Sequence, residues 1–367
     1  MELKRLLKGF RPICSNGGIV VLNRHNRLYL WDIIGNRKEF LLDIPQKFLV
    51  RCLSKLRIFE RIIRSEPRAA LCYQDILYVS YKSVLYKISL AQKKIVDSHF
   101  FQNSHNNPLP SDLVAIDGIG GFANQVVYGE YWMNDNGSSV GIYADTGNWT
   151  KVYEFPKNTV RHIHAIVPDK YRDCVWILTG DNDEESGFWK ATNNFEQVEP
   201  VLIGKQLYRS CCAHVYPEGI LFATDSPDEQ NYICMLKEDS NGYHIEKYCE
   251  INGSCIYSQQ TDEGSYFSTV VEFDNNIYPN FLTWITYRRG AAIKSWYSDL
   301  IYVSPHGDIK QIKNRFRKDI WPMRLCRYSA IEFCYVKELK KLLLYFVAVC
   351  GYDNEMFLCK IDGNEDG

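Results

Sequence analysis

Short apolar or alternating segments recur along this chain in groups of three or four, separated by turns rich in Gly, Asn, Asp and Pro. The clearest group contains four such segments, His162–Val167, Cys174–Thr179, Gly187–Ala191 and Gln197–Leu202. Each group takes about 40 to 50 residues, the repeat length of a four-stranded propeller blade. The sequence therefore predicts an all-β protein, a single β-propeller domain over residues 1–367, with seven blades preferred over six. Two tandem β-sandwiches are the alternative, although they explain the even repetition less well.

Composition and charge limit the classes of protein to which the chain can belong. Hydrophobic residues make up 46% and aromatic residues 14% of the chain, which suits pleated, packed β-structure. The 43 Lys and Arg residues are balanced by 44 Asp and Glu residues, so the chain lacks the basic excess of a dedicated nucleic-acid binder. We therefore expect no nucleic-acid partner.

The cysteines and the N-terminus bear on the compartment. The 13 cysteines are an odd number without metal-ligand spacing, and we interpret the adjacent Cys211 and Cys212 as small buried residues. The basic N-terminal segment lacks the apolar core of a secretory signal, and no apolar run reaches the roughly 20 residues that cross a bilayer. The sequence predicts reduced thiols, a cytoplasmic location and no transmembrane segment, and leaves the oligomeric state open.

One segment departs from the strand pattern. Residues 48–64 place Leu49, Leu53, Leu56, Phe59 and Ile63 near helical spacing with basic residues between them. We expect a short amphipathic helix here. Such a helix either packs on the propeller, which is the commoner case, or lies on an anionic membrane surface.

The third group ends in a turn motif, Ile142-Tyr143-Ala144-Asp145-Thr146-Gly147-Asn148-Trp149. It resembles the Asp-box of sialidase-like propellers, in which a carboxylate and a glycine build a tight hairpin turn and the Trp packs between sheets. Here Ala144 replaces the usual Ser, and the Gly-to-Trp spacing is one residue shorter.

A longer series of features is similar to the sialidase-like (BNR repeat) proteins associated with bacterial surface-polysaccharide genes. The series covers about two-fifths of the chain, at repeat-like intervals: Tyr128–Tyr131 with Asn134, Arg161–His164, Trp176–Ser186, Tyr208–Arg209, Phe222–Pro227 and Ser268–Glu272. The resemblance implies a propeller with a polar site near its axis. The group has no assigned reaction, so it transfers no catalytic role.

His162 and His164 are the first candidates for chemistry. They are two residues apart in a predicted inner strand, so both imidazoles should project to one face. That arrangement suits a metal pair, a proton-transfer site or a sugar-binding wall. The alternative is a pair of core histidines with satisfied hydrogen bonds.

Carboxylates gather near these histidines in the predicted topology. The loop 179–186 carries four acids, among them Asp181 and Asp183, and is either a solvated turn or a chelator of a hard cation such as Ca²⁺. No other cofactor is expected. Glu130 lies beside Tyr131, a pair of residue types that true sialidases use, but neighbours in a strand point apart, so that mechanism is not carried over.

Two arginines and a further aspartate occupy corresponding places in the repeat. Arg161 and Arg209 each precede the first strand of a group, where they would hold a sugar carboxylate or form interblade salt bridges. Asp225 follows the second strand of its group much as Asp181 does, either as a turn-builder or as part of a common site.

The sixth group adds two candidates. Period-two alternation places Tyr266, Ser268, Val270 and Glu272 on one face of a long strand. This mostly polar set is either a solvent-facing stripe or a contribution to the site.

Together these residues favour a carbohydrate-active enzyme, a glycoside hydrolase or polysaccharide lyase, acting on an acidic oligosaccharide or polysaccharide. The candidate catalytic residues are Glu130, His162, His164, Asp181 and Glu272, and the candidate substrate-binding residues are Arg161, Asp183, Arg209, Asp225 and Tyr266. The alternative is a non-catalytic propeller that binds a glycan or a protein in a polysaccharide-assembly system, since the fold alone does not imply catalysis.

Overall fold

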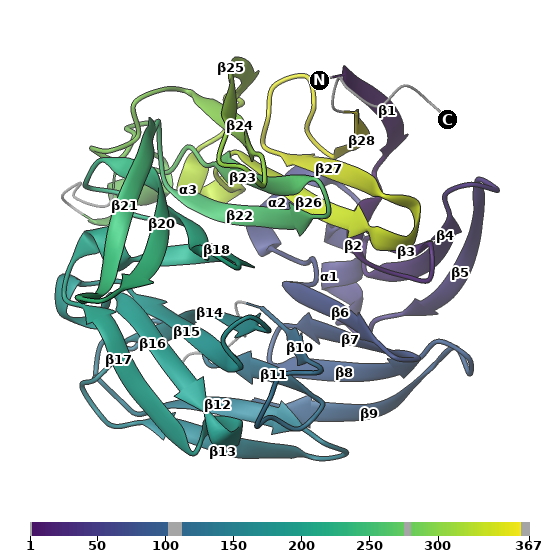
Figure 1. The fold of residues 1–367 in the computed structure, drawn as a ribbon. Helices are drawn as coiled ribbons and strands as arrows, with labels where there is room; N and C mark the ends of the chain where they lie inside the picture. The colour runs from purple at the N-terminus through teal and green to yellow at the C-terminus, as the bar shows by residue number, and fades with distance from the viewer. Residues whose placement is uncertain (1, 102–111, 275–279, 361–367) are drawn as a thin grey trace. The chain divides into compact units, whose positions relative to one another are not determined.

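The computed structural model describes residues 2–101, 112–274 and 280–360. The strands form seven antiparallel four-stranded sheets, and in six of them the four strands follow one another directly along the chain (Figure 1). The prediction of an all-β, seven-bladed propeller is confirmed. The chain divides into two compact units, unit 1 with Met1–Pro67 and Asn252–Gly367 and unit 2 with Arg68–Ile251, so the single domain over 1–367 stays a prediction.

Unit 2 contains four of the sheets. Their strands, in chain order, are β6 (Ala69–Tyr73), β7 (Ile76–Tyr81), β8 (Val84–Ser89) and β9 (Lys94–Phe100); β10 (Val114–Ile116), β11 (Gln125–Gly129), β12 (Val140–Asp145) and β13 (Trp149–Phe155); β14 (His162–Asp169), β15 (Cys174–Gly180), β16 (Gly187–Thr192) and β17 (Gln197–Ile203); and β18 (Ser210–Tyr216), β19 (Gly219–Thr224), β20 (Asn231–Asp239) and β21 (Gly242–Ile251). Short 3-10 turns η1 (Asp183–Glu185), η2 (Asn193–Phe195) and η3 (Gln206–Tyr208) lie between strands.

Unit 1 contains the other three sheets. They are built from β2 (Arg11–Asn16), β3 (Ile19–Arg24), β4 (Arg27–Asp32) and β5 (Arg37–Asp43); from β22 (Cys255–Thr261), β23 (Gly264–Thr269), β24 (Tyr297–Val303) and β25 (Ile309–Arg317); and from β26 (Ala330–Val336), β27 (Lys341–Val347), β28 (Glu355–Lys360) and β1 (Glu2–Lys8). The last sheet takes its outer strand from the N-terminus, because β1 pairs antiparallel with β28.

Among the described residues, the α-helices all belong to unit 1, as do two further 3-10 helices. They are α1 (Phe48–Leu53), α2 (Arg57–Ile63), α3 (Met323–Cys326) and the 3-10 helices η4 (Asn280–Trp284) and η5 (Lys337–Leu339). The amphipathic segment 48–64 is therefore two short helices, which a break at Ser54–Leu56 separates. Within the described ranges, none of the helices combines the length and the apolar character that crossing a membrane requires.

The core of unit 2 lies between neighbouring sheets. Neighbouring side chains of β14 point to opposite faces: Ile166 packs in the cluster that contains Val127 and Ile142 of the preceding sheet, and Ala165 packs in the cluster that contains Phe222 of the following sheet. The predicted turn at the end of β12 is confirmed as well, because Oδ1 of Asp145 accepts a hydrogen bond from the Gly147 amide at 3.0 Å.

A buried charge network joins distant parts of unit 1. The carboxylate of Glu66, which has a side-chain exposure of 6%, accepts from Arg327 at 2.6 Å and from Arg57 at 3.2 Å. Arg57 also binds Asp353 at 3.1 Å, and Arg11 binds Glu332 at 2.6 Å. Burial alone would raise the pKa of Glu66, but Arg57, Arg11 and Arg327 outweigh burial and lower this pKa to about 2.

We predict that Glu66→Gln destabilises the protein by about 3 kcal/mol at neutral pH, because it leaves three partly buried guanidinium groups without their shared anion. Since the pKa of Glu66 is depressed on folding, this stabilisation is present above the unfolded pKa of about 4.5 and is lost as the pH falls toward about 2. Urea unfolding of wild type and variant across this pH window measures both effects. The exposed Glu338→Gln serves as control, and equal stability of Glu66→Gln and wild type at pH 7 would contradict the assignment.

Candidate functional site

The predicted histidine pair lies at the start of β14 in unit 2. The two ring centroids are 4.9 Å apart, and the two Nε2 atoms are 3.0 Å apart. A bulge helps to bring the rings together: Ile163 pairs with Thr179 and Ala165 with Leu178, so His164 lies opposite no residue of β15. The two rings are neighbours, as period-two alternation predicts, although the local backbone is not a regular strand.

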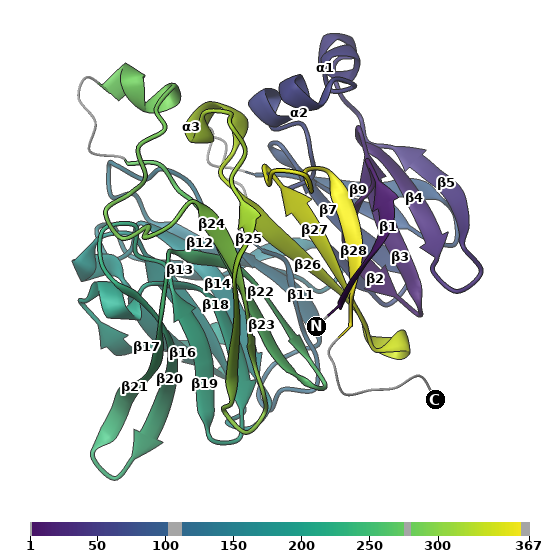
Figure 2. The ribbon, with the colours of Figure 1, turned by 90° about the horizontal axis from the view of Figure 1, so that it is seen from above.

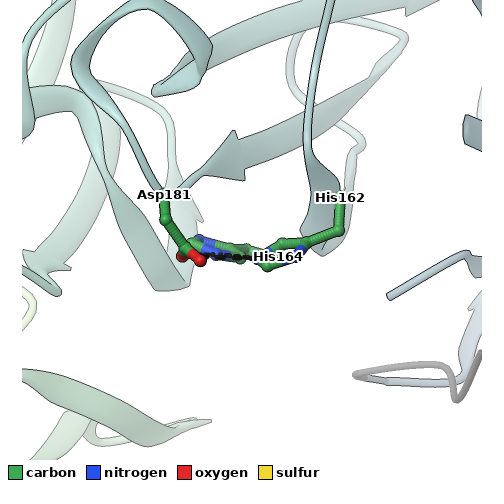
Figure 3. A group of neighbouring side chains, drawn as sticks. All are labelled: His162, His164 and Asp181. Atoms are coloured by element: carbon green, nitrogen blue, oxygen red, sulfur yellow. Dashed lines mark hydrogen bonds and ion pairs between the residues drawn. The ribbon is translucent and has the colours of Figure 1, made fainter. Parts of the chain in front are cut away.

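Asp181 completes the group from the end of β15. Its Oδ1 atom lies 3.3 Å from Nε2 of His162 and 3.2 Å from Nε2 of His164, and Figure 3 shows the three side chains meeting end to end. Both imidazoles are buried, whereas the Asp181 side chain keeps an exposure of 23%. The carboxylate is therefore the side of the group that reaches solvent.

Main-chain carbonyls set the orientation of both rings. Nδ1 of His162 lies 2.9 Å from the Trp132 carbonyl, and Nδ1 of His164 lies 3.2 Å from the Ser210 carbonyl. A carbonyl oxygen can only accept, so each Nδ1 carries a proton, and whenever the ring is neutral its Nε2 lone pair faces Asp181.

A second layer of side chains surrounds the three. The Tyr131 ring stacks against His162 with a centroid distance of 4.0 Å, and the Arg68 guanidinium lies 4.5 Å from the Tyr131 ring centroid. Arg209 binds Asp181 twice, through Oδ1 at 3.0 Å and through the main-chain carbonyl at 3.0 Å. These contacts hold the aspartate and one histidine in place.

Asp225 and Cys211 lie beside Arg209 and His164. The Asp225 carboxylate is 3.7 Å from Nε of Arg209 and accepts a hydrogen bond from the Cys211 thiol at 3.2 Å. Two overlapping groups with His164 in common, His162–His164–Asp181 and His164–Cys211–Asp225, each bring their ligand atoms within 4.8 Å of one another. The site is thus built by two consecutive blades.

Burial governs the protonation of the cluster. Burial lowers the pKa of His162 and raises the pKa of Asp225 and, together with the nearby Asp225 carboxylate, the pKa of the Cys211 thiol. Burial would also raise the pKa of Asp181, but the neighbouring His162 and His164 side chains and the charge of Arg209 outweigh burial and hold this pKa well below its ordinary value. Asp181 is therefore the anion of the site at neutral pH.

Five of the ten predicted site residues converge here, namely His162, His164, Asp181, Arg209 and Asp225. Asp183 lies beside them on an exposed turn, where its carboxylate accepts from Gln206, which also donates to the Asp181 carbonyl, both at 2.9 Å. Arg161 pairs with Asp135. Glu130 is buried within its own blade and accepts from the Gly141 amide at 2.7 Å.

The remaining two predicted residues, Tyr266 and Glu272, belong to unit 1, whereas the cluster belongs to unit 2. Tyr266 is buried in an apolar cluster with Leu300 and Phe316, and the Tyr302 ring lies 5.1 Å away. Ser268 and Val270 are buried too, so this part of the strand face is core rather than an open polar stripe.

Cys211 is the site residue that the sequence interpretation missed, because an adjacent pair of cysteines in a strand is ordinarily core. The strand register identifies it. Thr179 pairs with Ile163 and Thr224 with Ser210, and the bulge residue that follows is His164 in one blade and Cys211 in the next. The two residues are thus structural equivalents.

No protein-family model matches the chain, and no curated protein matches it. Solved structures do show similarity. They include the propeller domain of Cps50 (Swd1) from Myceliophteria thermophila, with a TM-score of 0.55, 10% identity and coverage of 97% of this chain and 99% of that chain. A chain of the Mitotic Checkpoint Complex gives a TM-score of 0.54 at 7% identity, over 99% of this chain and 91% of that chain. At these identities the similarity establishes the β-propeller fold and nothing about function.

Gly180 shows how tightly the cluster is packed. A Cβ atom on Gly180 would lie 2.4 Å from Cε1 of His164, which is closer than atoms can approach. We predict that Gly180→Ala displaces the His164 ring and destabilises the protein by about 1 to 3 kcal/mol.

A double-mutant cycle with His164→Ala tests the cause, with urea unfolding as the measurement. If the clash with the ring is responsible, Gly180→Ala should cost under about 0.5 kcal/mol in the His164→Ala background. Equal costs in both backgrounds would show that Gly180 acts through something other than His164.

Proposed function

We propose that His162, His164 and Asp181 bind a divalent transition-metal ion, with Zn²⁺ the first expectation, and that the protein uses this centre to act on an acidic carbohydrate. One observation carries the metal proposal. Two Nε2 atoms and one carboxylate oxygen converge at 3.0 to 3.3 Å while both Nδ1 atoms face carbonyl oxygens.

The triangle formed by Nε2 of His162, Nε2 of His164 and Oδ1 of Asp181 is suited to bind a cation. With Nδ1 protonated on both neutral rings, three lone pairs face one another across the triangle. One proton can link only part of such a set, whereas a metal ion accepts all three at once. In protein metal sites a ligating histidine ordinarily donates its other ring N–H to a carbonyl or carboxylate, as His162 and His164 do here.

The distances also suit zinc. Ligands about 2.0 to 2.1 Å from a tetrahedral Zn²⁺ ion lie roughly 3.3 Å from one another. The three separations in the triangle, 3.0, 3.2 and 3.3 Å, are close to this value. Two imidazoles and one carboxylate favour Zn²⁺ or Fe²⁺ over Ca²⁺, which prefers oxygen ligands alone, and three protein ligands leave a position open for water or substrate.

The neighbouring residues support an acid–base or elimination chemistry on a sugar acid. Such an ion would polarise a substrate oxygen or a bound water. Tyr131, under Arg68 and against His162, offers a phenol beside the centre, and Arg209 holds Asp181 in place. The carbohydrate part of the proposal draws on the resemblance of the repeat motifs to sialidase-like propellers, and on these residue types.

A non-catalytic binding propeller is the second candidate. The observation that favours it is the set of large apolar side chains that unit 1 exposes, including Phe48, Phe281 and Ile320. In that case the metal would be structural, and binding would occur without turnover.

We predict that the metal-free protein binds one Zn²⁺ per chain and that His164→Ala or Asp181→Asn abolishes this binding. Elemental analysis after chelation and reloading, and calorimetric titration with Zn²⁺ alone, measure it. Zn²⁺ at 100 times its dissociation constant should stabilise wild type by about 2.7 kcal/mol and leave both variants unchanged. The exposed histidine variant His244→Ala is the matched control. Stoichiometric binding that survives both site variants would refute the centre.

We further predict that the Zn²⁺-loaded protein cleaves an acidic oligosaccharide and that Asp181→Asn does not. Mass spectrometry of a panel of uronic-acid and nonulosonic-acid oligosaccharides separates the outcomes. Hydrolysis products together gain one water, whereas elimination products together keep the mass of the parent. If the oligosaccharide binds but is not cleaved, the protein is the non-catalytic binding propeller of the second candidate. If it is neither bound nor cleaved, the carbohydrate proposal is contradicted, and the metal centre is unaffected by that result.

A further inference from the structure

Unit 1 exposes an unusual number of large apolar side chains on its helices. We define the helical end of unit 1 as α1, α2, α3, η4 and residues 319–322. Its most exposed apolar side chains are Phe48 (80%), Leu49 (66%), Phe281 (67%), Trp284 (47%), Ile320 (77%) and Trp321 (46%). Isolated exposed apolar residues are common, but clustered ones mark an interaction surface.

These segments, far apart in sequence, are tied to one another. Arg61 of α2 binds Asp319 and the Cys326 carbonyl of α3, both at 2.6 Å. Arg324 of α3 lies over the Trp284 ring of η4 at 4.6 Å and donates to Thr283. Figure 2 shows α1, α2 and α3 at the same end of unit 1. The exposed apolar side chains therefore come from segments at one end of unit 1.

The exposed charged side chains at the helical end of unit 1 are all basic. Within residues 47–64, 280–290 and 317–327, every exposed charged side chain is basic: Lys47, Lys55, Arg64, Arg288 and Arg317. The two acids in these segments are Glu60, which is buried, and Asp319, which pairs with Arg61 and Lys318; of the five basic residues, Arg288 pairs with Asp274 at 3.4 Å. The whole chain carries a net charge of −1, so this excess of positive charge is local.

We infer that the helical end of unit 1 docks on an anionic lipid bilayer. Aromatic and aliphatic side chains at the tips of several short elements can enter the headgroup region, and the surrounding Lys and Arg residues are attracted to anionic lipids. A nucleic acid would match the charge but would leave Phe48, Leu49 and Ile320 without apolar surroundings. This inference is independent of the proposed metal centre and uses no residue of unit 2.

Vesicle flotation with the full chain tests the inference. Vesicles of phosphatidylcholine alone are compared with vesicles that contain a third phosphatidylserine, at low and high salt. We expect binding to the anionic vesicles that weakens at high salt, because screening reduces the attraction of the basic side chains. Equal partitioning into both vesicle types would overturn the electrostatic half of the inference.

Two pairs of variants separate the apolar from the charged contribution. Phe48→Ser with Leu49→Ser should weaken vesicle binding about tenfold or more, since both side chains lose apolar burial. Lys47→Glu with Lys55→Glu should weaken binding to anionic vesicles by a similar factor and reduce its salt dependence. The matched controls are Ile34→Ser with Phe40→Ser, exposed apolar residues on strands and turns of the same unit, and Lys337→Glu with Lys340→Glu.

The remaining outcomes point to a different docking surface or to a different partner. If the controls weaken binding as much as the variants, the helical end is not the docking surface. If no vesicle is bound but sedimentation shows a dimer that Phe48→Ser with Leu49→Ser dissociates, the face is an interface with a second copy. If neither vesicle binding nor self-association occurs and an acidic peptide binds instead, the partner is a protein. Each of these results overturns the bilayer inference.

Discussion

The pairing of β1 with β28 is the constraint on which unit 1 depends. Without β1, the C-terminal strand would be an open sheet edge with unpaired N–H and C=O groups. Arg5 and Lys8 reinforce the pairing through the nearly buried carboxylate of Glu355. The Glu66 network serves the same end, because its partners come from both terminal parts of the chain. Unit 1 is thus one compact unit made from two distant stretches of sequence.

In unit 2 the backbone decides the chemistry. A bulge frees His164 from its place in the ladder, and carbonyl oxygens of Trp132 and Ser210 fix the tautomers of both histidines. The same bulge in the next blade presents Cys211 instead. Equivalent positions therefore recur from blade to blade. The residue type at each position determines whether its side chain packs in the core or contributes to a site.

The two functional features lie in different units. The proposed metal centre uses β14, β15 and β18 of unit 2, whereas the proposed membrane face uses the helices of unit 1. Because no residue is shared, substitutions in one can be interpreted without the other. A protein held at a membrane and carrying a metal-dependent site for acidic sugars would join the two proposals, and neither requires the other.

The repeat pattern by itself determined the fold class, because turn residues and period-two alternation are local properties of the chain. It also determined that His162 and His164 are neighbours and that Asp181 and Asp225 occupy corresponding strand ends. It could not determine that β1 completes the last sheet, since strand pairing between the two ends of the chain has no local signal. Nor could it show that Glu130 turns into its own blade, that Tyr266 is core, or that Cys211 belongs to the site, because bulges, carbonyl contacts and burial arise only when neighbouring blades pack together.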